Sequence, residues 1–138
     1  MRGLATALIT IVTLTGGAGV AEAQRRGGDP ELAAVKNPVP ATAASIRTGQ
    51  QVYGKQCRHC HGLRGRGDGA LAPKNPSPPD LTDGKWEFGS SDGEIFAVVM
   101  NGADPKSEMK GMKGTLQDRD VWNIVNFLRS IGPKDAKR

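Results

Sequence analysis

The pattern of hydrophobic and polar positions predicts its strongest helix near the C-terminal end of the chain, in TLQDRDVWNIVNFLRSIG, residues 115–132. Apolar residues recur there at the i, i+3, i+4 and i+7 spacing of one helix face, at Val121, Ile124, Val125 and Leu128. Trp122 and Phe127 flank this stripe and are expected to join the core. Gly132-Pro133 is a stop signal for the helix.

A second helix is predicted from Ser45, which can serve as its N-cap. Gly49, Tyr53 and Cys57 then recur every four residues, so they share one face of the helix. A glycine inside a helix costs about 1 kcal/mol relative to alanine. Gly49 therefore indicates that another backbone approaches the helix closely at that point.

A third, shorter helix is predicted to begin at Ser91 or Asp92, with Glu94 in its first turn, and to end at Asn101-Gly102. Between these helices no alternating pattern long enough for a strand is present. The fold class is therefore predicted to be all-α, with three to four short helices and long loops.

The loops are long for so small a domain, and the core is small. Residues 62–86 are rich in glycine and proline, and residues 102–114 form a second loop; loops of this length are usually functional. Aromatic residues make up only 4% of the chain, and a core this small rarely contributes more than about 3–5 kcal/mol. A large apolar group held at the centre would fill the core and give both loops a surface to pack on.

The N-terminal region has the features of an export signal. A basic residue is followed by an apolar run, residues 4–15, and by the small-x-small pattern that ends at Ala23. Cleavage there predicts a signal peptide over 1–23, too short to span a bilayer comfortably. Residues 24–44 are interpreted as a flexible tether, with a short packed extension as the alternative. The folded domain is predicted over 45–133 and a C-terminal tail over 134–138.

The segment CRHCHG, residues 57–62, holds both cysteines and both histidines of the 138-residue chain. Cys57, Cys60 and His61 fit C-x-x-C-H, the pattern of c-type haem attachment. Two thiols at this spacing can add to the two vinyl groups of one haem, and the next residue can then offer its imidazole to the iron. The predicted cofactor is one covalent haem c.

Three other interpretations of the same residues remain open. A thiol–disulfide oxidoreductase would use Cys57 and Cys60 as a dithiol, but it would need a βαβ framework. A zinc site would need four ligands around a tetrahedron, normally from two separated pairs. A plain structural disulfide is compatible with export to an oxidising compartment.

Taken together, residues 47–131 resemble a class I mono-haem c-type cytochrome. RTGQQVYGKQCRHCHGLRGRGDG is similar to the N-terminal block of that family, DGEIFAVVMNG to its middle helix and TLQDRDVWNIVNFLRSIG to its last helix. The resemblance implies that the first and last helices cross, with Gly49 and Tyr53 packed against Ile124 and Phe127. It implies an electron carrier that transforms no substrate.

The resemblance also implies the residues around the haem. His61 would be the proximal ligand and Met109 the distal one, with Met112 as the competitor, because Lys110 stands where the family usually has proline. Pro79 would accept a hydrogen bond from the proximal imidazole, with Pro73, Pro76 and Pro78 as the competing prolines, and Leu81 would pack on the ring. Trp86 and Arg64 are the candidates for binding the propionates. Met100, on the predicted middle helix, is expected in the core.

The expected partners are redox proteins in the periplasm, such as a dehydrogenase, an oxidase or another cytochrome. A basic rim around the haem edge would steer the chain toward an acidic partner; its candidate residues are Arg58, Arg64, Arg66, Lys106, Lys110 and Lys113. Neither nucleic acid nor stable membrane insertion is expected. The alternative to a free carrier is a cytochrome fixed in a dehydrogenase or oxidase complex.

Overall fold

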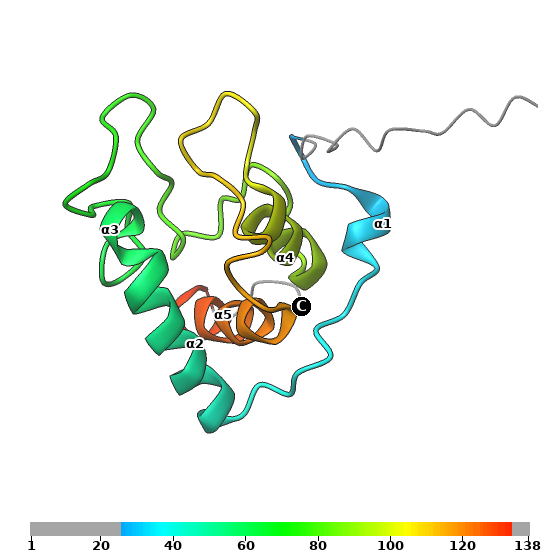
Figure 1. Cartoon of the computed structure of the whole chain (residues 1–138). Coiled ribbons are helices and arrows are strands. Elements are labelled where there is room, and N and C mark those ends of the chain that lie inside the picture. Colours follow the sequence, from blue (N-terminus) through cyan, green and yellow to red (C-terminus); the bar gives the residue numbers. More distant parts are fainter. Residues whose placement is uncertain (1–25, 134–138) are drawn as a thin grey trace, which may run out of the picture.

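Helices joined by long loops make up the part of the chain that this computed structural model describes, residues 26–133 (Figure 1). The helices are α1 (Pro30–Ala33), α2 (Ala43–Gln56), α3 (Arg58–His61), α4 (Asp92–Asn101) and α5 (Asp118–Ile131). Among the described residues the β-type pairing is limited to two isolated bridges, so the predicted all-α class is confirmed. The predicted signal peptide and C-terminal tail lie outside the described residues.

The first and last long helices, α2 and α5, cross as predicted. A Cβ added to Gly49 would overlap the carbonyl oxygen of Asn123, so the backbones of the two helices touch at this point. The ring centroids of Tyr53 and Phe127 lie 5.1 Å apart. The predicted apolar stripe of α5 is buried, together with Trp122 and Phe127. This crossing forms the lower part of the molecule in Figure 1.

The start of α2 differs from the prediction. Thr42, not Ser45, is the N-cap, and its Oγ1 accepts a hydrogen bond from the backbone N–H of Ser45 at 3.1 Å. The prediction that Ser45 caps the helix is therefore wrong. The Ser45 hydroxyl is buried and donates instead to Oδ1 of Asn123 at 2.6 Å, and this bond to α5 requires Ser45 to lie inside the helix.

The middle helix, α4, begins and ends as predicted. Ser91 is its N-cap and forms a capping box with Glu94, and the helix ends before Gly102, whose φ is 91°. It packs on α5 through a stacked aromatic pair, in which the rings of Phe96 and Trp122 lie 4.1 Å apart and 18° from parallel. None of the described helices is long and apolar enough to cross a membrane.

The segment before α2 does not hang free over its described part. Residues 26–42, which contain α1, run along α4 and then past α5 (Figure 1). The Asn37 side chain donates to the carbonyl of Trp122 at 3.1 Å and to Oδ1 of Asn126 at 3.0 Å. Over residues 26–42 the segment is thus packed against the domain, as in the alternative to a flexible tether over 24–44. Hydrogen bonds in which one partner or both are side chains hold it there.

Candidate functional site

The short helix α3 winds the C-x-x-C-H segment into one turn. Cys57 closes α2 and opens α3, and its carbonyl accepts hydrogen bonds from the N–H groups of Cys60 and His61 at 3.2 and 3.0 Å. Positions 57, 60 and 61 are therefore related as i, i+3 and i+4, which places them on one face of the turn. Both thiols and the imidazole are half-buried.

The thiols have the properties of packed groups rather than of a reactive dithiol. Cys57 and Cys60 are both free. Burial, with a contribution from Cys60, raises the pKa of the Cys57 thiol to about 11. Redox-active thiols of oxidoreductases have lowered pKa values, because the thiolate is the nucleophile. Burial thus makes Cys57 a poor attacking thiol for a thiol–disulfide oxidoreductase. Within residues 26–133 no three His, Cys, Asp or Glu side chains lie close enough together to hold a metal ion.

The imidazole of His61 is suited to ligate a metal. Burial lowers the pKa of His61, which favours the neutral ring that metals bind. Its Nδ1 is buried and has no hydrogen-bond partner. The predicted bond from Nδ1 to the carbonyl of Pro79 is therefore not formed in this structure.

The turn formed by residues 57–61 is called the attachment turn from here on. Pro79 lies in the segment that packs against it. The N–H of Gly67 donates to the carbonyl of His61 at 3.0 Å. A Cβ added to Gly67 would overlap the carbonyl oxygen of Pro78 and lie 3.4 Å from that of Pro79. Only a glycine lets the proline segment come this close, and either proline carbonyl is near the turn that carries His61.

Leu81, Trp86 and Arg64 lie in the same long loop but in different environments. Leu81 is buried in the core cluster, and its N–H donates to the carbonyl of Gly65 at 2.7 Å. Trp86 packs against that cluster, and its Nε1 is buried without a hydrogen-bond partner. Arg64 is exposed, so the structure does not place its guanidinium beside Trp86 in a shared buried site.

These observations fit a haem. The attachment turn offers two free thiols and a neutral imidazole. The indole N–H of Trp86 is a buried donor that lacks an acceptor, and buried indole N–H groups usually find one; a propionate oxygen would supply it. The donor set is that of a haem site rather than of a tetrahedral metal site.

The two candidate distal ligands lie together on the loop between α4 and α5. Met109 and Met112 are both half-buried. The N–H of Met112 donates to the carbonyl of Val99 at 2.9 Å, and the carbonyl of Met109 accepts from the N–H of Ala103 at 3.3 Å. On one side of Lys110 the loop is thus fastened to the last turn of α4, and on the other side to Ala103, just beyond the end of α4. Met100 is half-buried on α4 itself.

Sequence reasoning missed how residues 62–72 wrap the attachment turn. The Tyr53 hydroxyl donates to the carbonyl of Gly62 at 2.8 Å, and the N–H of Leu71 donates to the carbonyl of His59 at 2.8 Å. A Cβ at Gly69 would overlap the carbonyl oxygen of His59. The alternation of glycine along 65, 67 and 69 was the signal that could have revealed this close packing.

Comparison with known proteins decides the family. Residues 44–128 match the family described as cytochrome c oxidase, cbb3-type, subunit III. The chain belongs to this family. It is therefore a c-type cytochrome domain, and the assignment to haem binding and electron transport follows. The match covers all residues discussed above as candidate ligands and both crossing helices up to Leu128.

Individual relatives of this cytochrome domain are larger proteins. The cbb3-type cytochrome c oxidase subunit CcoP of Azospirillum brasilense is 26% identical over 90 residues, which cover 65% of this chain and 30% of the relative. The thiosulfate dehydrogenase of Stutzerimonas stutzeri (strain A1501) is 29% identical over 94 residues, which cover 67% of this chain and 29% of the relative. The chain spans under a third of the length of these curated relatives.

Solved structures agree on the cytochrome fold. The reducing HAO-like protein complex of Kuenenia stuttgartiensis contains a chain that matches with a TM-score of 0.62 at 26% identity, over 72% of this chain and 50% of that one. Cytochrome cL from Hyphomicrobium denitrificans matches with a TM-score of 0.57 at 24% identity, over 71% of this chain and 53% of that one. The small cytochrome c fold is thus shown.

Proposed function

We propose that this chain is an exported single-electron carrier with one haem bound covalently through Cys57 and Cys60. The observation that carries the proposal is the one-turn helix that sets these thiols and the His61 imidazole on one face, inside a cytochrome domain. When bound, the haem supplies an iron that takes up and releases one electron. The protein transforms no substrate.

The chain's own residues anchor the group, ligate it and limit its contact with water. The two thiols make the attachment permanent, which suits a protein released from the cell interior. His61 would be the proximal ligand and Met109 the distal one, and a His/Met pair favours electron transfer over oxygen binding because it leaves the iron no free position. Trp86 would donate its buried N–H to a propionate, and Leu81 would pack beside the ring.

Replacing each methionine separately tests the ligand assignment. In the oxidised protein, the weak sulfur-to-iron band in the far red should disappear in Met109→Ala and persist in Met112→Ala. The two side chains lie three positions apart on one loop and are equally half-buried, so each variant is the control for the other. Loss of the band in Met112→Ala alone would reverse the assignment. A colourless mature protein with unmodified thiols would overturn the whole proposal.

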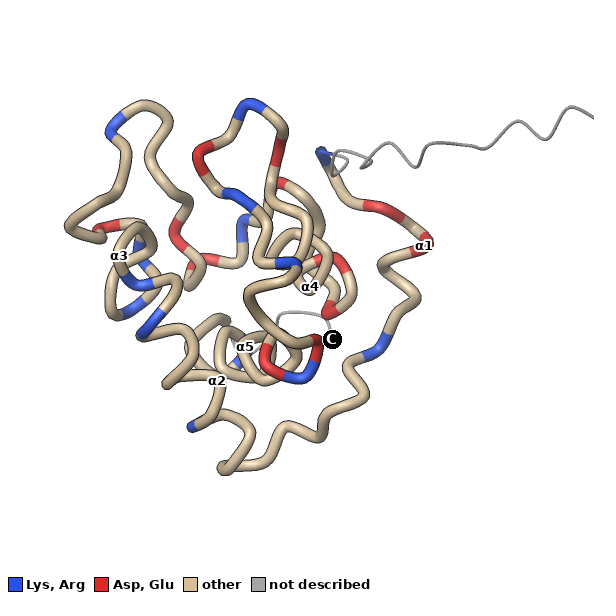
Figure 2. Tube along the Cα trace, viewed as in Figure 1, with Lys and Arg blue, Asp and Glu red and all other residues tan. Residues whose placement is uncertain are grey.

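A basic face around α3 is the proposed docking surface. Residues 55–79 carry five Lys or Arg residues and one acidic residue, whereas residues 80–108 carry seven acidic and two basic residues. Figure 2 shows several basic positions around α3 and acidic positions near α1 and α4, with further charges of both signs on the loops and at the start of α5. This asymmetry would turn the attachment turn toward an acidic partner, at a rate that falls as salt rises.

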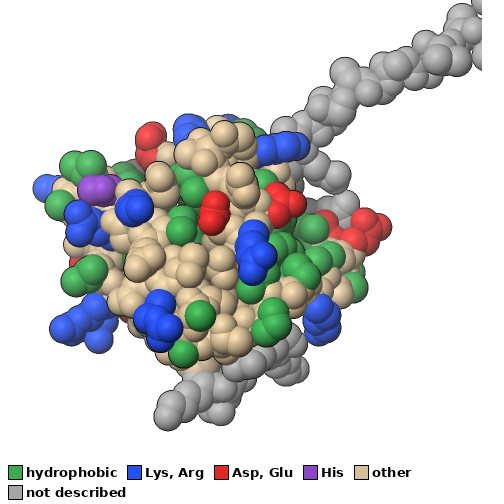
Figure 3. Space-filling view, turned by 60° about the horizontal axis from the view of Figure 1, so that its bottom comes forward, with side chains coloured by type: hydrophobic (Ala, Val, Ile, Leu, Met, Phe, Trp, Pro, Cys, Tyr) green, Lys and Arg blue, Asp and Glu red, His purple; other side chains and the backbone are tan. Residues whose placement is uncertain are grey.

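The same face has an apolar centre. Leu63 and Leu71 are 72% and 70% exposed, more than any other large hydrophobic side chain in the described part of the chain. The N–H of Leu71 donates a hydrogen bond to the carbonyl of His59 in the attachment turn. In Figure 3 an exposed histidine at one end of the molecule has hydrophobic and basic side chains around it. An apolar centre with a charged rim is the usual layout of a protein interface.

A gold electrode coated with mixed carboxylate- and methyl-terminated thiols imitates such a partner. The oxidised protein should adsorb to it and exchange electrons, and Leu71→Asp should lower the adsorbed amount several-fold. Thr48→Asp is the charge-matched control, because Thr48 is also exposed but lies near the start of α2, away from α3. Equal loss in both variants would contradict docking through the α3 face while leaving the haem assignment intact.

The choice between a free carrier and a complex subunit rests on the assembly. The CcoP relative is named as a subunit of an oxidase, and the Kuenenia stuttgartiensis structure is a complex. A free carrier should elute at the size of one chain from gel filtration of a native periplasmic extract, at low and high salt alike. Elution with larger proteins at both salt concentrations would favour the fixed subunit.

A further inference from the structure

Residues 26–42, called the strap from here on, lie outside the segment that matches the family, 44–128. Nevertheless the strap contacts two helices of the cytochrome domain through groups that are buried in that domain. Those contacts fall at two places, one on the first turn of α4 and one on the outer side of α5. The two places are separate, so the strap bridges them.

On α4 the strap is bound by the carboxylate of Glu94. This side chain is only 6% exposed, and its Oε1 accepts a hydrogen bond from the N–H of Asp29 at 2.8 Å. Its other oxygen accepts from the N–H of Ser91 at 2.8 Å, within the capping box of α4. One buried carboxylate therefore serves both the helix start and the strap.

The neighbouring residue, Gly93, shows how closely the two backbones approach. A Cβ added to Gly93 would overlap the carbonyl oxygen of Leu32 and come within 2.6 Å of the Cβ of Val35. The strap thus occupies the space that a side chain at this position would need. The domain side of the contact is shaped to receive it.

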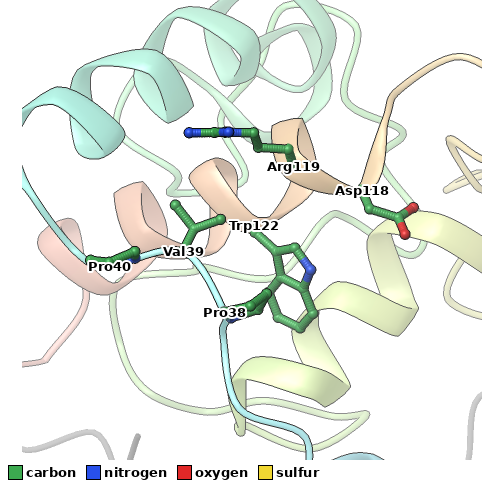
Figure 4. A pocket seen from close by; sticks show the side chains of 6 residues that line it. All are labelled: Pro38, Val39, Pro40, Asp118, Arg119 and Trp122. Carbon is green, nitrogen blue, oxygen red and sulfur yellow. The ribbon is translucent and has the colours of Figure 1, made fainter.

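On α5 the strap is bound by Asn126, which is 5% exposed. Its Nδ2 donates to the carbonyl of Val39 at 3.0 Å, and its Oδ1 accepts from Asn37 at 3.0 Å. Buried amides need such partners, and the strap supplies most of them here. The strap also lines an open pocket of about 430 Å³ over Trp122, through Pro38, Val39 and Pro40. Pro38 lies beside the indole of Trp122 (Figure 4).

The loop between α4 and α5 contains Met109 and Met112 and is called the methionine loop from here on. It is fastened to the C-terminal end of α4. The N–H groups of Met112 and Lys113 donate to the carbonyls of Val99 and Met100 at 2.9 and 3.0 Å. A Cβ at Gly111 would overlap the carbonyl oxygen of Met100. The position of this loop therefore depends on the position of α4.

We infer that the strap is a positioning element that clamps α4 onto α5 and, through α4, holds the methionine loop in place. By this inference Glu94, Gly93 and Asn126 act on the haem site without touching it. The part that concerns the distal ligand rests on the proposed function. The part that concerns α4 and its loop does not.

Hydrogen exchange of the haem-loaded protein, resolved by residue, tests the clamp itself. In Gly93→Ala the new methyl group prises the strap from α4, and the amides of α4, Met112 and Lys113 should exchange several-fold faster. The amides of α2 should be unchanged, which separates local loosening from global destabilisation. Gly54→Ala is the matched control, since Gly54 also lies on a helix but a Cβ there would meet nothing within 4 Å.

Binding of imidazole to the oxidised haem tests the consequence for the site. An added ligand enters when the loop releases the iron, so its binding rate should rise several-fold in Gly93→Ala and in a variant that lacks residues 27–41. It should not change in Gly54→Ala. If the deletion variant does not fold, Gly93→Ala and Asn37→Ala still decide the outcome.

Two results would overturn the inference. One is faster exchange of the strap amides in Gly93→Ala with no change in α4 or the methionine loop. The other is an equal acceleration in α2 and α4, which would make the strap a general stabiliser only. Faster exchange in α4 without faster imidazole binding would overturn the link to the distal ligand and would bear on the proposed function instead, where the methionine variants give a separate answer.

Discussion

Two regions of this cytochrome domain bring one backbone against another through a glycine, and they do so in different ways. At Gly49 two regular helices, α2 and α5, cross. At Gly93 the short helix α1 and the residues that follow it lie on the first turn of α4. The first contact leaves a periodic trace in the sequence, because both partners bury apolar stripes. The second leaves none, because its strap side consists of backbone groups, isolated polar residues and a few apolar residues that do not recur at a helical spacing.

The difference in chemistry follows from the difference in structure. Around the crossing, Tyr53, Ile124 and Phe127 are buried, and burial of apolar area dominates such contacts. The strap is held by hydrogen bonds instead. Glu94 and Asn126 bond to backbone groups of the strap, and Asn37 bonds to Asn126. Each such bond contributes only about 0.5–1.5 kcal/mol net. We therefore expect the crossing to limit global stability and the strap to control local opening.

The largest effect is expected from Gly49→Ala. The added Cβ would overlap the carbonyl oxygen of Asn123, so the two helices would have to separate. Overpacking of this kind typically costs 1–3 kcal/mol, and we expect about 3 kcal/mol because backbone cannot move aside as a side chain can. Guanidinium unfolding of the haem-loaded protein measures it.

The neighbouring Gly54→Ala is the control for helix propensity. A Cβ there meets nothing within 4 Å, so alanine should stabilise α2 by up to about 1 kcal/mol. Equal midpoints of guanidinium unfolding for Gly49→Ala and Gly54→Ala would show that the crossing tolerates a side chain at Gly49. The closeness of the two backbones would then not matter to stability.

Most of the fold could be predicted from the sequence because its helices have strong local signals. The stripe of α5, the capping pair Ser91 and Glu94, and the stop at Gly102 all lie where the pattern placed them. Ser45 misled the prediction because it resembles a cap, while its hydroxyl has a partner on α5 that no local pattern could reveal. The packing of the strap could not be predicted for the same reason, since Asp29 and Asn37 have their partners, Glu94 and Asn126, 65 and 89 positions away.

The residues of the candidate site also fall into two groups, those with a local sequence signal and those without one. Cys57, Cys60 and His61 are local and could be predicted from spacing alone, and the structure winds them into one turn. Pro79, Trp86 and Arg64 depend on how a long loop folds, which has no periodicity to guide prediction. There the outcome is mixed, with Trp86 offering a buried unpaired donor, Arg64 exposed and no bond from His61 to Pro79.

On the strap, Asn37→Ala should have the next largest effect. The change removes donors to Trp122 and Asn126 and the acceptor for the N–H of Val39. Asn37 is only half-buried, so water can replace part of these bonds, and we expect a loss of about 2 kcal/mol or less. Thermal unfolding measures the loss. A stability equal to that of the parent protein would mean that the strap is not coupled to the global fold.

At the crossing, Tyr53→Phe should cost less than either change above. The ring and its contact with Phe127 would remain, and only the hydroxyl that donates to the carbonyl of Gly62 would be lost. That carbonyl also accepts from the N–H of Gly65 at 3.4 Å, so it would not be left without a partner. We expect the free energy of unfolding, measured with guanidinium, to fall by about 1 kcal/mol. A loss as large as that in Gly49→Ala would show that the hydroxyl organises the loop around α3.

The smallest effect, and the one most specific to the strap, depends on pH. Burial tends to raise the pKa of Glu94, but hydrogen bonds from Ser91, Asp29 and Ser90 outweigh it and hold the pKa below its usual range. A carboxyl group with a lowered pKa in the fold stabilises it fully above its unfolded pKa, about 4.3. This contribution is lost as the pH falls through the lower, folded value.

Unfolding free energies of the parent protein and of Glu94→Gln, measured from neutral pH downward, isolate this contribution. The difference between the two should be constant at neutral pH and should shrink as acid protonates Glu94, because the parent protein then also has an uncharged side chain there. The protection factors of the strap amides, which allow for the slower intrinsic exchange in acid, should begin to fall over the same pH interval, while those of α2 at the crossing should not. A difference that stays constant down to acid unfolding would show that the charge of Glu94 does not hold the strap, and that the shape of the contact at Gly93 does so alone.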